Sequence, residues 1–236
     1  MSLQLAPSSP LTRAAYWLTA ATTALTAAFL LGRYPALPWL LPVHFMANGV
    51  PNGWQFRTLA RVFAPVFVQI ALTLSLGPIS MLLRSRGHDR HDPDGPDVQA
   101  ARIASEAVAT ILAVWVIFQA YAATAIVAMW MRQREGLGWA YTPAEVIGAL
   151  ASVAIAARAM RKIGRPSPKP FRAEHWRLGQ LYHNPDDPAL FVPTRDGSRW
   201  TLNFGRPVAA LLMGIILVFG MLGPTTILAL VLRYRF

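Results

Sequence analysis

The sequence predicts an all-α fold: a polytopic membrane helix bundle of about five transmembrane helices, with a small β-hairpin on its cytoplasmic side. The chain is 54% hydrophobic and only 14% charged, whereas soluble chains carry about 25% charged residues. Several apolar runs approach or exceed the ~20 residues that a helix needs to cross a bilayer core. The polar residues gather in a few segments between these runs.

Composition also excludes several kinds of site. The chain has no cysteine, so disulfides, thiolate metal sites and cysteine nucleophiles are ruled out. The net charge of +11 is explained by basic residues beside membrane helices, which set helix orientation. Because no nucleic-acid-binding motif accompanies this charge, we expect membrane lipids and no nucleic acid as partners.

Residues 1–83 are expected to form a two-helix unit. The first apolar run, 14–31, predicts a retained helix, because it is longer than the usual signal-peptide core and no small-x-small cleavage site follows it. Its Ala20, Ala24 and Ala28 predict a small-residue packing face. The second run, 62–83, contains Pro78, which predicts a kink or a break near Gly77.

Residues 84–102 read as a cytoplasmic loop, since they are rich in Gly, Pro and Asp. The stretch "HDRHDPDGPD" holds metal-ligating residue types, but their irregular spacing in such a loop predicts no metal site.

Residues 103–160 should form the third helix, 103–131, and the fourth, 143–160. Thr142 to Glu145, "TPAE", predicts a capping box at the start of the fourth. Gly148, Ser152 and Ala156 predict its packing face.

Residues 161–207 are the main polar segment, with nine Lys and Arg against four Asp and Glu. Strands are expected at 190–192 and 200–204, joined by the hairpin dipeptide Asp196-Gly197. Residues 208–236 supply a fifth membrane helix, bent at Gly223-Pro224.

Loop charge predicts the orientation. With five helices and a cytoplasmic N-terminus, fifteen Lys and Arg lie inside and seven outside, as the positive-inside rule favours. The C-terminus is then extracytoplasmic, and the loop between the first two helices is extracytoplasmic too.

That loop contains "LPVHFMANGVPNGW", residues 41–54. Asn48-Gly49 and Asn52-Gly53 predict two turns, because both residue types tolerate positive φ. Two turns so close together would gather the aromatic and polar side chains near the membrane surface. Either the loop only caps the bundle or it binds a ligand, and the candidate ligand-binding residues are His44, Phe45, Asn48, Asn52 and Trp54.

The same residues resemble the Pro-x-His-Phe-x-x-x-Gly-x-x-Asp-Gly-Trp signature of the SdpI-like family of multi-pass bacterial membrane proteins. The matching positions are Pro42, His44, Phe45, Gly49, Gly53 and Trp54, within about residues 10–83. The resemblance implies a protein of the bacterial cytoplasmic (inner) membrane that senses, or gives immunity to, an extracytoplasmic peptide. Asn52 stands where the family has Asp, which argues against a carboxylate-dependent role.

A second stretch, "YHNPDDPALFVPTRDGSRWTLNFGRP" at residues 182–207, resembles a small module of unknown function found in similar membrane proteins. Asn184 to Pro188 predict a rigid turn before the hairpin. The module either packs against the cytoplasmic helix ends or docks a partner. The candidate partner-docking residues are Asn184, Asp186, Asp187, Phe191 and Trp200.

Enzyme signatures are absent from the sequence, including Walker A, Gly-x-Ser-x-Gly and HExxH motifs. All five histidines lie outside the apolar runs, which argues against a haem pair. We therefore expect a non-enzymatic protein without cofactors. Gln69 and Gln119 within the runs are expected to hydrogen-bond between helices. The alternatives to a peptide receptor are an accessory subunit with a cytoplasmic or intramembrane protein partner and, third, a permease.

Overall fold

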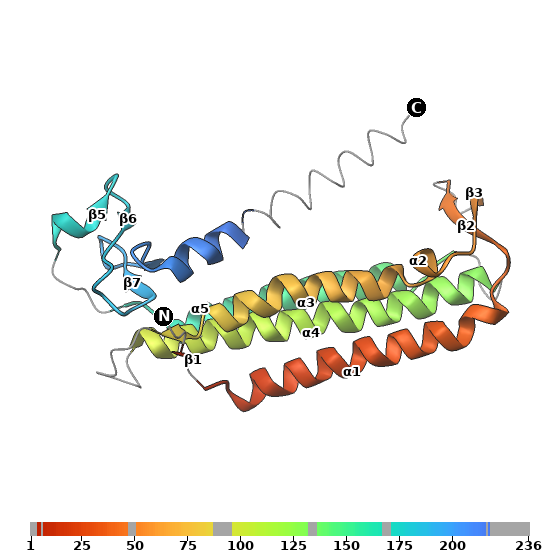
Figure 1. Ribbon diagram of the computed structural model, residues 1–236, viewed down its shortest axis with the longest axis horizontal. Helices are drawn as coiled ribbons and strands as arrows, with labels where there is room; N and C mark the ends of the chain where they lie inside the picture. Colours follow the sequence, from red (N-terminus) through yellow and green to blue (C-terminus); the bar gives the residue numbers. More distant parts are fainter. Residues whose placement is uncertain are drawn as a thin grey trace. The chain divides into compact units, whose positions relative to one another are not determined.

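The computed structural model describes residues 4–5, 7–46, 51–86, 96–131, 136–166, 171–215 and 217 (Figure 1). Within them, four helical stretches are long and apolar enough to cross a membrane: Pro10–Ala36, Ala64–Leu82, Val98–Trp130 and Tyr141–Ile163. They indicate an integral membrane protein with a helical bundle. Most of the fifth predicted span, 208–232, lies outside the described residues.

The helices are α1 Pro10–Arg33, α2 Leu59–Val62, α3 Ala64–Leu82, α4 Pro96–Trp130 and α5 Tyr141–Ile163, with 3₁₀ turns η1 Tyr34–Ala36 and η2 Ala173–His175. Residues 207–215 are also helical. Short strands pair antiparallel in twos: β1 Gln4–Leu5 with β4 Ser85–Arg86, β2 Leu40–Phe45 with β3 Pro51–Phe56, β5 Trp176–Arg177 with β6 Leu181–Tyr182, and β7 Phe191–Pro193 with β8 Trp200–Leu202.

The chain divides into two compact units. One comprises Pro10–Leu76 and Ala109–Ala157, which we call the bundle unit. The other comprises Met1–Ser9, Gly77–Val108 and Arg158–Phe236, and it contains a compact polar region, residues 171–206, which we call the module.

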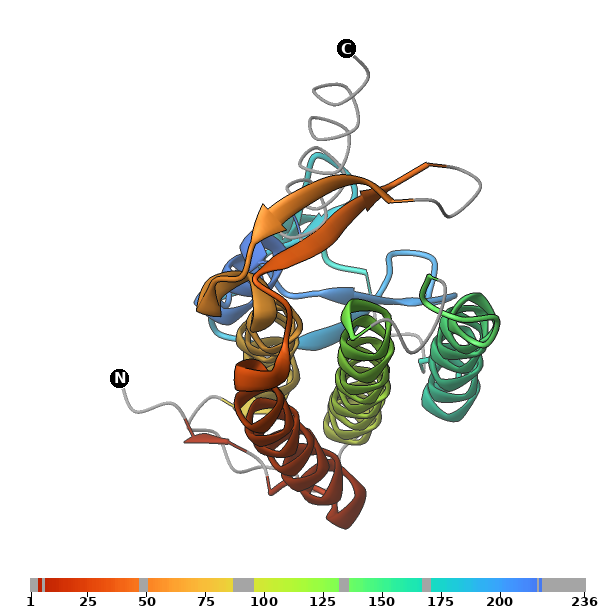
Figure 2. The same cartoon turned by 90° about the vertical axis from the view of Figure 1, so that its right-hand side faces the viewer.

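In the bundle unit, α1, α3, α4 and α5 run side by side, and the β2–β3 hairpin lies at one end (Figure 2). The hydrophobic core is concentrated near that end. Leu41 of β2 is fully buried among residues of α1, α2, α3 and α4, so the base of the hairpin is part of the core. The other buried members are Leu30, Leu37, Val62, Val66, Ala123, Val127, Met129 and Trp130.

Gln69 forms a polar link between three helices. It is fully buried in α3, and its Nε2 donates to the Thr26 hydroxyl of α1 at 3.1 Å and to the Val116 carbonyl of α4 at 2.9 Å. The predicted interhelical hydrogen bonding of Gln69 is thus confirmed. A buried side-chain amide in a membrane helix needs such partners, because lipid offers none.

The predicted packing face of α1 is wrong. Ala20, Ala24 and Ala28 are exposed, and the buried residues are Thr12, Ala15, Thr19, Thr26 and Leu30. Threonine can occupy a packed face because its hydroxyl is satisfied within the helix. Thr19 donates to the Ala15 carbonyl at 2.8 Å, and Thr26 donates to the Thr22 carbonyl at 2.7 Å.

The predicted packing face of α5 is partly confirmed. Gly148 is buried, with a side-chain atom of Val114 3.9 Å from where a Cβ would lie. The Ser152 hydroxyl accepts a hydrogen bond from the Trp115 indole at 3.1 Å. Small residues therefore line the contact with α4.

The capping box predicted at Thr142 does not form, and of the kink or break predicted near Gly77 the break is excluded. The Ala144 N–H donates to the Ala140 carbonyl at 3.0 Å, so α5 begins at Tyr141 and Thr142 lies inside its first turn. The turn before the helix supplies the first acceptor, and no capping box forms at Thr142. Pro78 lies inside α3, which continues to Leu82 without a break.

Candidate functional site

The predicted ligand-binding loop is a β-hairpin at one end of the bundle unit. β2 and β3 pair from Leu40 opposite Phe56 to Phe45 opposite Pro51, with irregular register around His44. The pairing brings His44 opposite Gly53 and Pro42 opposite Trp54. Asn48 lies outside the described residues.

His44 and Asn52 are brought into hydrogen-bonding contact, through His44 Nδ1 and Asn52 Oδ1. An amide oxygen can only accept, so this contact is a hydrogen bond in the histidine forms that carry a proton on Nδ1. Gly53 permits this arrangement, because a Cβ at that position would lie 2.8 Å from the His44 Cβ. The glycine thus serves a close approach between strands.

The predicted second turn is wrong, since Asn52-Gly53 lies within β3. Cross-strand pairing with β2 fixes this dipeptide in extended structure and overrides its local turn preference. Phe45 ends β2, and Trp54 is exposed on β3. The structure therefore brings together His44 and Asn52, with Trp54 two residues further along the strand.

Two side chains that the sequence did not single out fix the base of the hairpin. The Arg57 guanidinium donates to the carbonyls of Tyr34 at 2.8 Å and Leu37 at 2.6 Å, and lies 4.7 Å from the centre of the Tyr34 ring. The Trp130 indole donates to the Pro42 carbonyl at 2.9 Å. Arg57 thus satisfies carbonyls just after α1, as basic residues often do at helix C-termini.

A cavity of about 1100 Å³ lies beside the hairpin base in the bundle unit. Pro42 and Val43 of β2 contribute to its wall, and the rest comes from α2, α3, α4, the turn at 136–139 and the start of α5. Most of its lining is apolar, and its polar side chains include Arg61, Gln119, Tyr141 and Thr142. This combination of a large apolar surface and a few polar groups is typical of ligand-binding pockets.

The module is organised around Asn203, which is fully buried. Its Oδ1 accepts from the N–H groups of Asn184 and Gly205, both at 3.0 Å. Its Nδ2 donates to the carbonyls of Asn184, Asp187 and Ala189, at 2.8, 3.1 and 3.3 Å. One side chain thereby fastens the turn before the β7–β8 hairpin to the residues that follow it.

Gly205 is required by the same arrangement. A Cβ there would lie 2.4 Å from the Asn184 carbonyl carbon and 2.6 Å from the Pro185 nitrogen. These are backbone atoms that cannot swing aside, so the close approach admits only glycine. The sequence signal for both residues is the "NFG" that directly follows β8.

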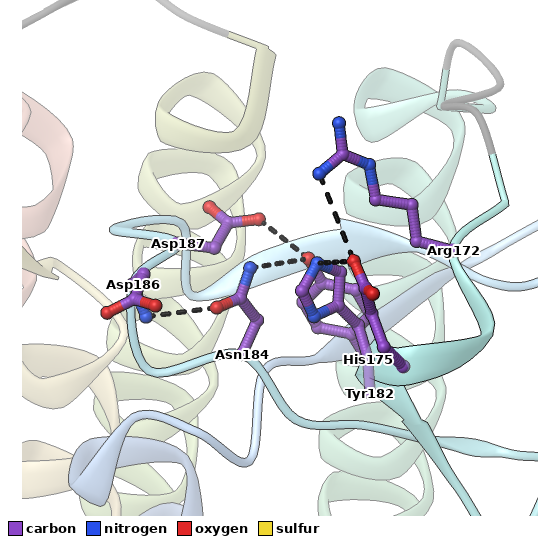
Figure 3. Close-up of polar contacts among 7 residues, drawn as sticks. Arg172, His175, Tyr182, Asn184, Asp186 and Asp187 are labelled. Atoms are coloured by element: carbon purple, nitrogen blue, oxygen red, sulfur yellow. Dashed lines mark hydrogen bonds and ion pairs between the residues drawn. The ribbon is translucent and has the colours of Figure 1, made fainter.

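Asn184 and Asp187 shape the predicted rigid turn (Figure 3). The Asn184 Oδ1 accepts from the Asp186 N–H at 3.0 Å, and the Asp187 Oδ1 accepts from the Ala189 N–H at 3.0 Å. The Tyr182 hydroxyl donates to Asp187 Oδ2 at 3.1 Å. Burial, with the neighbouring Asp187 charge, raises the pKa of Tyr182. These groups hold the fold, whereas the Asp186 side chain is exposed.

The predicted hairpin between the two strands is confirmed, with Phe191 opposite Leu202 and Pro193 opposite Trp200. Gly197 takes a φ of +67° in its turn. Hydrogen bonds from the Ser198 hydroxyl, the Thr194 hydroxyl and the Ser198 N–H lower the pKa of Asp196 to about 2. The Trp200 indole donates to the Gly164 carbonyl at 3.2 Å, which ties the hairpin to the end of α5.

Of the five candidate docking residues, Asn184 and Asp187 hold the turn, Trp200 joins the hairpin to α5, and Phe191 is half-buried in β7. Asp186 is the one of the five whose side chain is largely exposed.

Comparison with known proteins adds one match. Residues 185–209 match the model of a family of unknown function, DUF5808. This stretch contains the β7–β8 hairpin, Asn203 and Gly205, and it begins one residue after Asn184, to which Asn203 bonds. No curated protein and no solved structure matches the chain.

Proposed function

We propose that this protein is a non-enzymatic membrane receptor of the SdpI-like kind, which senses or gives immunity to an extracytoplasmic peptide at the β2–β3 end of its bundle unit. The observation that carries the proposal is the cavity of about 1100 Å³ beside the hairpin base. A volume of this order accommodates a few side chains of a bound peptide.

The chemistry of the cavity suits an amphipathic peptide. Apolar residues such as Val68, Ile126 and Met129 offer surface for apolar side chains, while Gln119 and Arg61 offer hydrogen bonds. Arg61 also donates to Gln55 and to the Phe56 carbonyl, so its guanidinium is held at the base of β3. A positioned cation of this kind favours a carboxylate of the ligand, such as a peptide C-terminus.

The hairpin supplies a second, more polar contact surface. His44, Asn52 and Trp54 are the residues proposed to contact the ligand, with Phe45 and Asn48 as the remaining members of the set. Anchoring by Arg57 and Trp130 keeps the hairpin in place before binding, which reduces the ordering cost of association.

The proposed orientation places the N-terminus in the cytoplasm and this hairpin outside, in a bacterial inner membrane. Support comes from the excess of Lys and Arg in the inside loops. Exposed aromatic residues also gather at this end: Trp39, Trp54, Phe56 and Trp139. Such residues suit the membrane–water interface, where the peptide would arrive.

The proposal is tested in a bacterial strain from which the gene is deleted and to which the original or a variant gene is returned on a plasmid. The cells are then exposed to peptides that the same bacterium secretes. The variant His44→Ala/Trp54→Ala should lose the protective or signalling phenotype while keeping the wild-type amount of folded protein. Trp17→Ala, a change of an exposed tryptophan on α1, is the matched control and should behave as wild type. A double variant that retains every such phenotype would contradict the proposal.

An accessory subunit of a larger membrane complex is the second candidate. The observation that favours it is the exposed apolar surface of α5, formed by Val146, Ile147, Leu150, Val153 and Met160. Lipid alone can cover such a surface, and so can another membrane helix. Purification in mild detergent separates the two cases, because a subunit should elute in a stoichiometric complex and a receptor as a monomer or homodimer. A permease is the third candidate and would need the cavity to reach the bilayer midplane.

A further inference from the structure

The module contains a second, smaller cavity whose chemistry differs from that of the first. Its volume is about 260 Å³, and its lining includes Arg172, Arg195 and His175 together with aromatic rings. None of the described residues that line it is acidic. The Arg195 guanidinium lies 4.6 Å from the centre of the Phe171 ring, which holds one cation at the rim.

This lining is suited to an anion. Arginine presents N–H donors in a planar fork that matches phosphate oxygens. The exposed Glu174 carboxylate lies 4.0 Å from Arg172 and 3.6 Å from His175, and pairings with so exposed a carboxylate contribute little in water. The cavity can therefore receive a phosphate group without first breaking a strong ion pair.

Trp176 of β5 and Tyr182 of β6 line this cavity, and the turn that joins these two strands has an unusual residue at its tip. Leu178 has a φ of +50° and is 91% exposed, and Gly179 has a φ of +72°. Two successive residues with positive φ favour Asn-Gly or Gly-Gly. At a positive φ, the Cβ of leucine crowds the backbone, which is energetically unfavourable. Because the side chain is exposed to water, no burial of apolar surface offsets this cost. An apolar tip of this kind is explained if the turn enters an apolar phase.

The module follows closely on one helix that can span a bilayer, and its other end continues directly into helical residues. Gly164 follows α5, whose sequence can span a bilayer, and the Trp200 indole bonds to its carbonyl. Only six residues lie between Gly164 and Phe171, so the seven steps along the chain limit that distance to about 25 Å. On the other side, the helical residues 207–215 follow Arg206 directly. The cavity and the Leu178 tip can thus reach the lipid headgroups.

We propose that the module binds the phosphate of an anionic phospholipid in the cavity between Arg172 and Arg195, while the Leu178 tip enters the adjoining lipid interface. The exposed Phe171 and Leu181 contribute further apolar surface on either side of this tip in the sequence. The lipid would fasten the module to the membrane surface. An inorganic phosphate ion shares the same chemistry, and the experiment below separates the two sources.

The test uses the full chain in liposomes, with one fluorescent label. Because the chain has no cysteine, Gln180→Cys places a single environment-sensitive dye next to the tip, and Ser198→Cys places it on the β7–β8 turn as a control. In vesicles of phosphatidylcholine with phosphatidylglycerol, the dye at position 180 should be quenched by spin-labelled lipid and protected from iodide. The dye at position 198 should remain accessible to iodide.

Two sets of substitutions then test the assigned residues in the Gln180→Cys background. Leu178→Asn suits the turn better than leucine, so it should preserve the fold yet restore access to iodide. Arg172→Gln and Arg195→Gln should each lower the lipid-bound population by about five-fold, the value expected for one basic residue at an anionic surface. Arg199→Gln, which does not line the cavity, is the matched control.

The proposal is overturned if the dyes at positions 180 and 198 are equally accessible to iodide, or if pure phosphatidylcholine vesicles protect position 180 as well as anionic ones do. Inorganic phosphate is added to the detergent-solubilised protein in the final arm. A change in the dye signal with phosphate, combined with none from anionic lipid, would assign the cavity to free phosphate and reject the lipid.

Discussion

The side chain of Asn203 bonds to both backbone polar groups of Asn184, accepting from its N–H at 3.0 Å and donating to its carbonyl at 2.8 Å. The pattern resembles the paired hydrogen bonds between two antiparallel strands, except that a side-chain amide takes the place of one backbone. It replaces backbone pairing where Pro185 interrupts the chain, since proline has no N–H to donate.

Replacing Asn203 should therefore unfold the module. Asn203→Leu has a similar size but leaves five partly buried backbone groups without this partner, and a fully buried group in that state would cost about 1–3 kcal/mol. We expect rapid proteolysis between residues 182 and 206, measured by mass spectrometry of the cleaved protein in detergent. Arg199→Ala, an exposed change in the neighbouring turn, should leave the cleavage rate unchanged. Equal rates for the two variants would contradict the role of Asn203.

Gly205→Ala should have a similar effect for a steric reason. The added methyl would lie 2.4 Å from the Asn184 carbonyl carbon, and such overpacking costs about 1–3 kcal/mol or more. Gly214→Ala is the matched control, because its Cβ would meet no atom within 4 Å and it lies in a helix. We expect hydrogen exchange across residues 182–206 to accelerate for the first variant alone.

The β7–β8 turn should weaken in acid. The folded-state pKa of Asp196 is lowered to about 2 from 3.8 by hydrogen bonds from Ser198 and Thr194. A depressed carboxyl pKa contributes stability above the unfolded-state value, and this contribution is lost as the pH falls from about 4 to about 2. Cleavage by pepsin within residues 190–204 should rise over this range. Asp196→Asn has no carboxyl group to titrate at this position, so its cleavage reports only how the activity of pepsin varies with pH. Cleavage of the unaltered protein should rise more than cleavage of this variant as the pH falls.

The hairpin at the bundle end should depend on Trp130. Trp130→Phe keeps most of the packing but removes the donor to the Pro42 carbonyl, at a cost of about 1 kcal/mol. Hydrogen exchange in residues 40–56 should accelerate roughly five-fold, as that free energy implies. Trp17→Phe on the exposed side of α1 should have no effect. An unchanged exchange rate in the Trp130 variant would mean that the indole does not hold the hairpin.

Topology can be tested with two single cysteines, at Asn52 and at Ser198. On intact cells, a membrane-impermeant thiol reagent should label position 52 and spare position 198, because the inside loops carry the larger share of Lys and Arg. Labelling of both sites, or the reverse pattern, would reject the proposed orientation and with it the extracytoplasmic peptide.

The membrane helices and the β7–β8 hairpin could be predicted because their signals are local. Long apolar runs and an Asp-Gly dipeptide between two short strand patterns need no tertiary information. The helix ends were less predictable: α5 begins at Tyr141 because a preceding turn supplies its first carbonyl, although Thr142 has the capping residue type.

The parts that failed depend on contacts between distant residues. Asn52-Gly53 favours a turn in isolation, yet pairing with β2 makes it part of a strand. Alanine is the expected contact residue of a membrane helix, yet α1 turns its threonines inward, where Thr26 meets Gln69 of α3. From the sequence, Arg57 is one of the basic residues that set the orientation of the helices. The structure shows that its guanidinium also donates to the carbonyls of Tyr34 and Leu37.

The Gln69 contacts also have a consequence for biogenesis. Its amide bonds to Thr26, which precedes it in the chain, and to Val116, which is synthesised later. The first contact can form once α3 has entered the membrane, but the second must wait for α4. Until α4 is in place, the Gln69 amide has only the first of these two contacts, so the packing of α1 with α3 is completed by α4. Gln69 thereby sets the axial heights of three helices at a single level, and a slip by one turn of any of them would strand the amide in hydrocarbon.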